Sequence, residues 1–175
     1  MASKKILMII AFENFRDEEY FVPKEIFERA GIKVVTVSTK KGTAIGSQGG
    51  EAEIDFTLDE VDAKDFNGIV FVGGAGAHKH IDDAQFYQLA QQAVASQKVL
   101  AAICIAPAIL AKAGVLVGKK ATVWSSALDK SAIKILEENG AIYQTESVVW
   151  DRNIITANGP EAAKCFGERI IKSLT

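Results

Sequence analysis

Apolar and polar positions divide this chain into blocks whose lengths suit strands and helices. Strand-length segments rich in apolar or β-branched residues lie at 5–12, 33–39, 68–74, 98–104 and 121–124. Amphipathic stretches of helix length alternate with them at 18–30, 82–97, 107–113 and 129–140. The alternation predicts an α/β protein with helices on both faces of a mostly parallel sheet.

Three local features refine this pattern. Residues 147–157, SVVWDRNIITA, predict a hairpin that turns at residues 151–153. Pro160 suits the first turn of a final helix, where its missing N–H costs little. Pro23 lies inside the 18–30 pattern and predicts a kink or an irregular helix start around residues 17–20.

Length and composition place the chain among ordinary globular proteins. Its 175 residues suit one domain spanning 1–175, and 49% are hydrophobic and 24% charged. The net charge of −2, with scattered lysines and arginines, argues against nucleic acid or an anionic membrane as a partner. No apolar run is long enough for a membrane span. The N-terminal apolar run continues into acidic residues without a cleavage site, which favours a strand over a secretory signal.

The chain has two cysteines, Cys104 and Cys165, in dissimilar contexts. This arrangement does not suggest a disulfide framework, and we expect a cytoplasmic, reduced enzyme or binding protein. Cys165 lies in the amphipathic stretch of the last helix, where a buried structural thiol is expected.

Ligands of parallel α/β sheets bind outside the carboxyl ends of the strands. Four segments of this chain are expected there: 13–19, 73–80, 104–107 and 124–126. These segments are therefore the expected positions of catalytic or binding side chains.

Cys104 is expected at a sharp turn between a strand and a helix. Pro107 suits the first turn of a helix, and Ala102 and Ala106 give the small–x–nucleophile–x–small spacing of a nucleophile elbow. At a helix N-terminus the pKa of the thiol would be lowered. The alternative is that Cys104 fills the core as a small apolar residue.

A cysteine nucleophile needs a proton partner, and carboxylates are the stronger candidates here. Asp17, Glu18 and Glu19 follow the first strand, at the same sheet edge as the elbow. Most of the three are expected to be a solvated first helical turn. His78 and His80 form a pair without a clear third ligand, so no metal site is predicted.

The glycines at 73–76 offer backbone N–H groups to a developing oxyanion. The segment lacks the third glycine of a dinucleotide-binding fingerprint. The acidic loop after the first strand would repel phosphate, so a flavin or nucleotide cofactor is not expected.

Several motifs together resemble the ThiJ/PfpI superfamily: AAICIAP after an apolar strand, GG ending an earlier strand, and an acidic turn followed by VP and RAGIKV. The resemblance covers nearly the whole chain. It implies a flavodoxin-like, doubly wound sandwich and a homodimer or higher oligomer. It also implies a nucleophilic Cys104 in a strained backbone conformation, hydrogen-bonded to Glu19, and an oxyanion site at the N–H groups of Gly74 and Ile105.

The sequence departs from both branches of that superfamily. The protease-like branch has histidine after the cysteine, where this chain has Ile105, and takes a glutamate from a neighbouring subunit at a position matching His78. The deglycase-like branch has a histidine in the pocket where Trp124 is expected. Trp124 and His78 are therefore predicted to line the pocket, Trp124 as wall or dimer packing.

The leading hypothesis is a cofactor-free stress-response enzyme of the glyoxalase or deglycase type. It would act through Cys104 and Glu19 on small α-oxoaldehydes or on glycated protein. One alternative is a redox sensor or chaperone that uses an oxidisable Cys104. A second is a PfpI-type cysteine peptidase or amidase, disfavoured because Ile105 cannot accept a proton.

Overall fold

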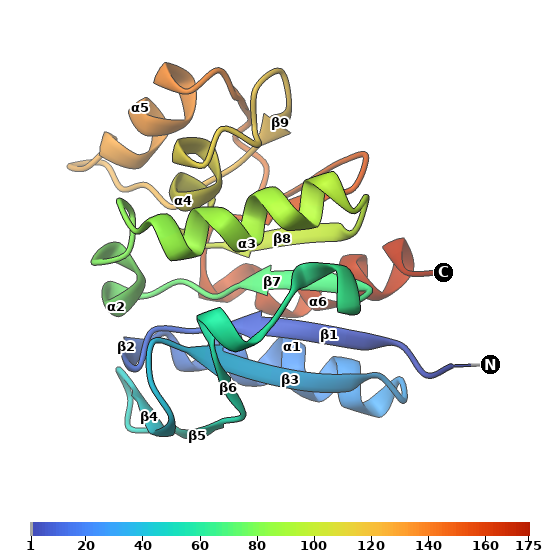
Figure 1. The fold of residues 1–175 in the computed structure, drawn as a ribbon. Coiled ribbons are helices and arrows are strands. Elements are labelled where there is room, and N and C mark those ends of the chain that lie inside the picture. Colours follow the sequence, from blue (N-terminus) through green and yellow to red (C-terminus); the bar gives the residue numbers. More distant parts are fainter. Residues whose placement is uncertain (1) are drawn as a thin grey trace.

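The computed structural model describes residues 2–175, and its centre is a mostly parallel sheet (Figure 1). Within those residues the sheet has seven strands in the order β11-β12-β8-β7-β1-β3-β6. Their bounds are β1 Lys5–Ile9, β3 Lys33–Ser38, β6 Phe56–Thr57, β7 Gly68–Phe71, β8 Val99–Ile103, β11 Val148–Asp151 and β12 Ile154–Ala157. Only β11 runs antiparallel, through its hairpin with β12. The order β3-β1-β7-β8-β12 is the flavodoxin-like order, which confirms the expected fold.

Helices cover both faces of this sheet (Figure 1). Helices α1 (Asp17–Arg29) and α6 (Ala163–Ser173) lie together behind it, while α3 (Ala84–Ala95) and α4 (Ala106–Lys112) lie in front. The other helices are α2 (Ala75–His78) and α5 (Ser131–Glu138), with 3-10 turns at Leu58–Glu60, Ala63–Asp65 and Pro160–Ala162. No helix in residues 2–175 is both long and apolar enough to cross a membrane.

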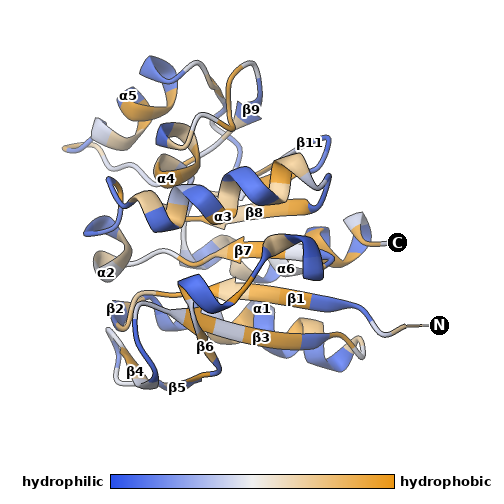
Figure 2. Ribbon diagram, in the orientation of Figure 1, coloured by the Kyte–Doolittle hydropathy of each residue, from blue (hydrophilic) through white to orange (hydrophobic). Residues whose placement is uncertain are grey.

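Strands β7 and β8 carry no polar side chain, and β1 has one only at its first position, because both faces of these strands are buried (Figure 2). In β8, Leu100 and Ala102 belong to the hydrophobic cluster beneath α3 and α4. Ala101 and Ile103 belong to the cluster beneath α1 and α6. The period of two along the strand thus divides its side chains between two cores.

Pro23 corrects one expectation. Helix α1 is continuous from Asp17, so the irregular start around residues 17–20 is wrong. Pro23 is buried where α1 crosses α6, and a Cβ on Gly167 would lie only 3.2 Å from the Pro23 Cα. Close packing of the two helices offsets the hydrogen bond that the proline cannot donate.

The strand expected at 121–124 is wrong beyond Ala121. Strand β9 (Lys120–Ala121) pairs with β10 (Ile142–Tyr143) in a small separate sheet. After it, the Thr122 N–H donates to Thr156 Oγ1 instead of joining a regular ladder.

A third sheet was not expected from the sequence. It comprises β2 (Glu13–Phe15), β4 (Gly42–Gly46) and β5 (Glu51–Ile54), and it lies beside the carboxyl end of β1 (Figure 1). These strands are short and partly exposed, so they lack the apolar runs of the main sheet. Their hairpin tip at residues 46–50 lies next to the start of α1.

Candidate active site

Cys104 lies at the turn between β8 and α4, as the small-residue spacing predicts. Its backbone φ is +64°, an uncommon value for a residue with a side chain. The Cys104 N–H donates to the Ala157 carbonyl at 2.9 Å, and its carbonyl accepts from the Trp124 N–H at 2.8 Å. Pro107 lies in the first turn of α4. Hydrogen bonds to two neighbouring segments therefore hold the elbow in its strained conformation.

Glu19 faces Cys104 from the first turn of α1. Its side chain is fully buried, and neither carboxyl oxygen has a nitrogen or oxygen partner among the described residues. The Cys104 thiol is the polar group that interacts with it. Its burial agrees with a group that acts on a neighbour rather than on solvent.

Gly73 makes the approach of these two side chains possible. A Cβ on Gly73 would lie 2.6 Å from the Cys104 Cβ and 3.2 Å from Glu19 Oε1. It would also lie 2.5 Å from the Ile103 carbonyl oxygen, which is part of β8 and cannot move freely. The segment that follows β7 therefore needs a residue without a side chain at position 73 for the pair to form.

Burial dominates the protonation of the pair. It raises the pKa of Glu19 to about 8, while the thiol beside it acts in the opposite direction. Burial, and then the charge of Glu19, raise the pKa of Cys104 to about 12. The expected lowering at a helix N-terminus is therefore wrong, because desolvation outweighs the backbone N–H groups. The Glu19 charge opposes a thiolate only where Glu19 is ionised, so a protonated Glu19 favours charge on sulfur.

The backbone N–H groups of Ile105 and Gly74 donate toward the Cys104 sulfur, and both lower its pKa. Gly74 has φ +111°, and a Cβ there would lie 2.5 Å from the Arg16 backbone nitrogen. The structure thus brings together Cys104, Glu19 and the two predicted amide donors. Two N–H groups beside a sulfur can stabilise negative charge on that sulfur or on an oxygen bound next to it.

A cavity of about 420 Å³ opens at the sulfur. It is lined by Arg16, Ser47, Gly74, Ala75, His78, Cys104, Ile105, Trp124 and Pro160. The structure thus places the predicted pocket residues Trp124 and His78 in this cavity. Trp124 is half-buried, Ile105 is buried and His78 is exposed. The cavity therefore has an apolar wall beside Cys104 and an imidazole on its exposed side.

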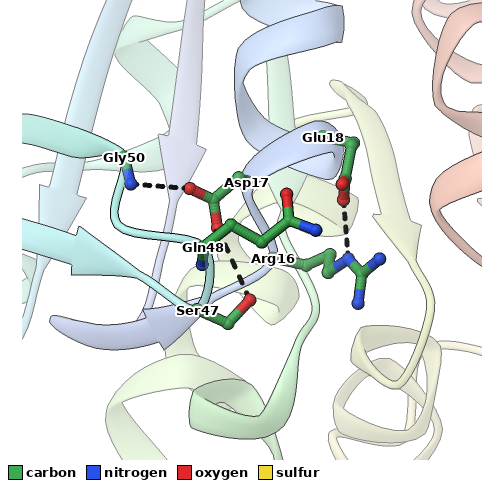
Figure 3. A network of polar contacts seen from close by, with 6 residues as sticks. All are labelled: Arg16, Asp17, Glu18, Ser47, Gln48 and Gly50. Carbon is green, nitrogen blue, oxygen red and sulfur yellow. Dashed lines mark hydrogen bonds and ion pairs between the residues drawn. The ribbon is translucent and has the colours of Figure 1, made fainter.

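The acidic turn differs from its expectation, since only Glu18 of the three carboxylates is partly solvated. Asp17 is buried and accepts hydrogen bonds from the N–H groups of Gln48 and Gly50, each at 2.8 Å (Figure 3). Glu18 forms an ion pair with Arg16 at 2.6 Å (Figure 3). The hydrogen bond from Arg16 lowers the pKa of Glu18. The three carboxylates therefore differ in their interactions, because each contacts a different neighbour.

Three lining residues were missed by sequence reasoning. Arg16 directly precedes the acidic turn, so its position was available from the sequence. Ser47 reaches the cavity only because the Asp17 carboxylate holds the 46–50 hairpin tip, which no local pattern reveals. Pro160, read as a helix start, also lines the cavity.

The remaining candidates lie outside this cavity. His80 interacts with Asp83 at 3.1 Å and stacks on Phe86, which gives it a structural setting apart from His78. Cys165 is half-buried rather than buried. Within residues 2–175, no group of three or more His, Cys, Asp or Glu side chains is arranged to hold a metal ion.

The comparison with protein families matches the DJ-1/PfpI family model to residues 4–173. The chain belongs to the DJ-1/PfpI family. This confirms the ThiJ/PfpI resemblance, which rested on the motifs around Glu19, Gly73 and Cys104.

Similar proteins match along almost the whole chain. An uncharacterized protein of Methanocaldococcus jannaschii is 41% identical over 99% of this chain and 84% of its own length. The protein/nucleic acid deglycase 2 of Escherichia coli is 30% identical over 98% of both chains. The crystal structure of a ThiJ/PfpI domain protein from Brachyspira murdochii superposes with a TM-score of 0.93 at 37% identity, covering 99% of this chain and 98% of that one. Members of the DJ-1/PfpI family that match this chain thus include deglycases, and also a general stress protein and a putative cysteine protease.

Proposed function

We propose that this DJ-1/PfpI member is an enzyme that converts small α-oxoaldehydes, free or as adducts on protein, to hydroxy acids without a cofactor. The observation that supports this proposal is the isolated pair of Cys104 and Glu19. A buried carboxyl whose polar neighbour is a thiol can exchange a proton with a substrate bound to that thiol. Deglycases among its relatives agree with this class of chemistry.

The reaction requires that the pair has lost one proton and that the thiol proton then passes to Glu19, so that the charge lies on sulfur. Sulfur then bonds to the aldehyde carbon, and the carbonyl electrons move to the oxygen, which the N–H groups of Gly74 and Ile105 stabilise. Glu19 protonates that oxygen and gives a hemithioacetal. The pair loses its first proton near pH 8, so turnover is expected to rise as the pH approaches that value.

The carboxylate of Glu19 next removes the proton from the former aldehyde carbon and returns it to the neighbouring ketone carbon. The hydroxyl proton of the hemithioacetal moves to the ketone oxygen in the same conversion. The aldehyde carbon is thereby oxidised to a thioester while the ketone is reduced to an alcohol, so no external oxidant or reductant is needed. Water hydrolyses the thioester, which releases the hydroxy acid and restores Cys104. The buried Ile105 and half-buried Trp124 keep this step in an apolar setting.

The test is to incubate the purified protein with methylglyoxal and to measure lactate. The wild type is expected to form lactate, and Cys104→Ala is expected to form none above background. Cys165→Ala is the matched control, because that second thiol is half-buried on α6 away from the cavity. Equal lactate formation by wild type and Cys104→Ala would rule out the proposal.

A second candidate function is a redox sensor. The same pair favours it, because a sulfinic acid on Cys104 could accept a hydrogen bond from the protonated Glu19. Treatment of the protein with mild peroxide, followed by peptide mass spectrometry, tests the sensor function. A sensor would oxidise at Cys104 well before Cys165, and equal oxidation of both thiols would exclude it.

A peptidase function is not favoured, because Ile105 follows the cysteine and offers no proton acceptor. A histidine placed against Cys104 by another subunit would revive it. We also propose that the protein is a homodimer in the cytoplasm. Leu128, in the loop that follows Trp124, is fully exposed, and a subunit contact would cover it.

A further inference from the structure

Arg16 gives the active-site cavity a fixed positive charge. Of the nine lining residues it is the one that is charged at every physiological pH, and none is a carboxylate. The other polar groups on this lining include the N–H groups of Gly74 and Ile105 and the hydroxyl of Ser47. A cavity that offers donors and a cation suits an anionic ligand.

The guanidinium is held in place at the cavity. Its Nε donates to Glu18 Oε2 at 2.6 Å (Figure 3). The Arg16 backbone N–H donates to the Gly73 carbonyl at 3.0 Å. Glu18 does not line the cavity and takes only Nε, so within residues 2–175 the two Nη groups have no hydrogen-bond partner. These two Nη groups lie on the edge of the guanidinium that can donate two parallel hydrogen bonds to a carboxylate.

The charge of Arg16 also acts on the reacting pair. The hydrogen bond that Arg16 donates to Glu18 is the largest cause of the raised pKa of Arg16, and the charges of Glu19 and Cys104 add smaller contributions. The guanidinium therefore lies near both groups. A ligand of a few carbons can bond to sulfur at one end and meet Arg16 at the other.

We propose that the cavity selects α-oxoaldehydes that carry a carboxylate a few carbons away from the dicarbonyl group. Arg16 binds the carboxylate, with Ser47 beside it, while Cys104 takes the aldehyde carbon. For turnover this proposal rests on the proposed function, but the selection of an anion at Cys104 is testable without turnover.

The first test compares alkylation of Cys104 by iodoacetate and by iodoacetamide in the full-length protein. Iodoacetate carries a carboxylate where iodoacetamide carries a neutral amide. The intrinsic reactivity of the thiolate affects both alkylation rates, so it cancels in their ratio. We expect this ratio to be at least about fivefold higher at Cys104 than at Cys165, each followed by peptide mass spectrometry. In Arg16→Gln the ratio at Cys104 is expected to fall to that of Cys165, and Arg16→Lys is expected to restore part of it.

Arg29→Gln is the matched control, because Arg29 also forms an ion pair with a glutamate but is exposed at the opposite end of α1 and does not line the cavity. It should leave the ratio unchanged. An unchanged ratio in Arg16→Gln, or no alkylation of Cys104 by either reagent, would overturn the proposal.

The second test compares turnover of 4,5-dioxopentanoate, which carries a carboxylate, with turnover of methylglyoxal. The preference for the anionic substrate is the ratio of its kcat/KM to that of methylglyoxal. Arg16→Gln is expected to lower this ratio by about tenfold, mainly by raising the KM of the anionic substrate. An equal loss for both substrates would show that Arg16 only supports the fold. If the wild type converts neither aldehyde, the proposed function fails, while the alkylation ratio still decides whether the anion site exists.

Discussion

Glu19 shows how strongly burial governs a single side chain in this protein. A carboxyl group loses most of its preference for ionisation when its polar neighbour is a thiol and water is excluded. Its pKa of about 8 lies well above the ordinary 4.5. Between pH 4.5 and 8 Glu19 is largely protonated in the folded protein but would be ionised in the unfolded chain. This difference lowers the free energy of unfolding.

Glu19→Gln is therefore expected to stabilise the protein at neutral pH. Below pH 4.5 the glutamate is protonated in both states and the substitution changes little. As the pH rises toward 8, the wild type alone loses stability, and at pH 7 the variant should be more stable by about 3 kcal/mol. Urea unfolding at pH 4.5, 6, 7 and 8 measures this difference, and a difference that does not grow with pH would contradict it.

For single residues, the sequence predicted which side chains meet at the candidate site better than it predicted their pKa values. Cys104 and Glu19 could be found because the elbow spacing and the acidic turn are local patterns, and the family resemblance paired them. The direction of the Cys104 pKa could not be found, because it depends on burial beneath strands distant in sequence. Helix-end electrostatics is local, whereas desolvation is a property of the folded whole.

The elements around the site depend on Asp17, which ties the start of α1 to the tip of the β4–β5 hairpin. Its two oxygens accept from the N–H groups of Gln48 and Gly50. A Cβ at Gly46 or at Gly50 would lie 2.5 Å from an Asp17 oxygen, so the hairpin tip closes directly on the carboxylate. Ser47 is held at the cavity by this contact.

Asp17→Ala is expected to destabilise the protein by roughly 1 to 3 kcal/mol, since two partly buried N–H groups lose a charged acceptor. Amide exchange at Gln48 and Gly50 should accelerate more than exchange in β8. Glu25→Ala, which removes an exposed carboxylate from the same helix, is the control and should cost well under 1 kcal/mol. Unchanged exchange at the hairpin tip would disprove the role of Asp17.

The long apolar strands and amphipathic helices were predicted because their burial period is strong along the sequence. The hairpin at residues 147–157 was also predicted correctly, including its turn. Strands β2, β4 and β5 were missed because they are short and half-exposed. The tip of the β4–β5 hairpin also contacts Asp17, some thirty residues earlier in the chain, which a local pattern cannot reveal.

The arrangement of the whole molecule follows from its strand order. Strands β1, β7 and β8 are neighbours at the centre of the sheet, and the segments that follow them supply Glu19, Gly74 and Cys104. The rule that ligands bind at the carboxyl ends of parallel strands therefore predicted which segments come together at the candidate site. Oligomeric state does not follow from strand order and needs its own measurement.

A dimer in solution is expected to have a mass of about 38 kDa, twice the 18.8 kDa of the chain. Size-exclusion chromatography with light scattering, over a hundredfold range of concentration, measures it. A mass that stays at the monomer value throughout would exclude the dimer.

The sealed position of Glu19 has a consequence for the fate of hydrogen isotopes. Its side chain has no exposed surface, so a proton taken from the substrate has no direct route to water before it is returned. When methylglyoxal is converted in D₂O, the C2 position of lactate should therefore retain mostly protium, as NMR spectroscopy can measure. Extensive deuterium at C2 would mean that water reaches Glu19 during turnover. Retention of protium at C2 would therefore show that Glu19 stays shielded from water during turnover.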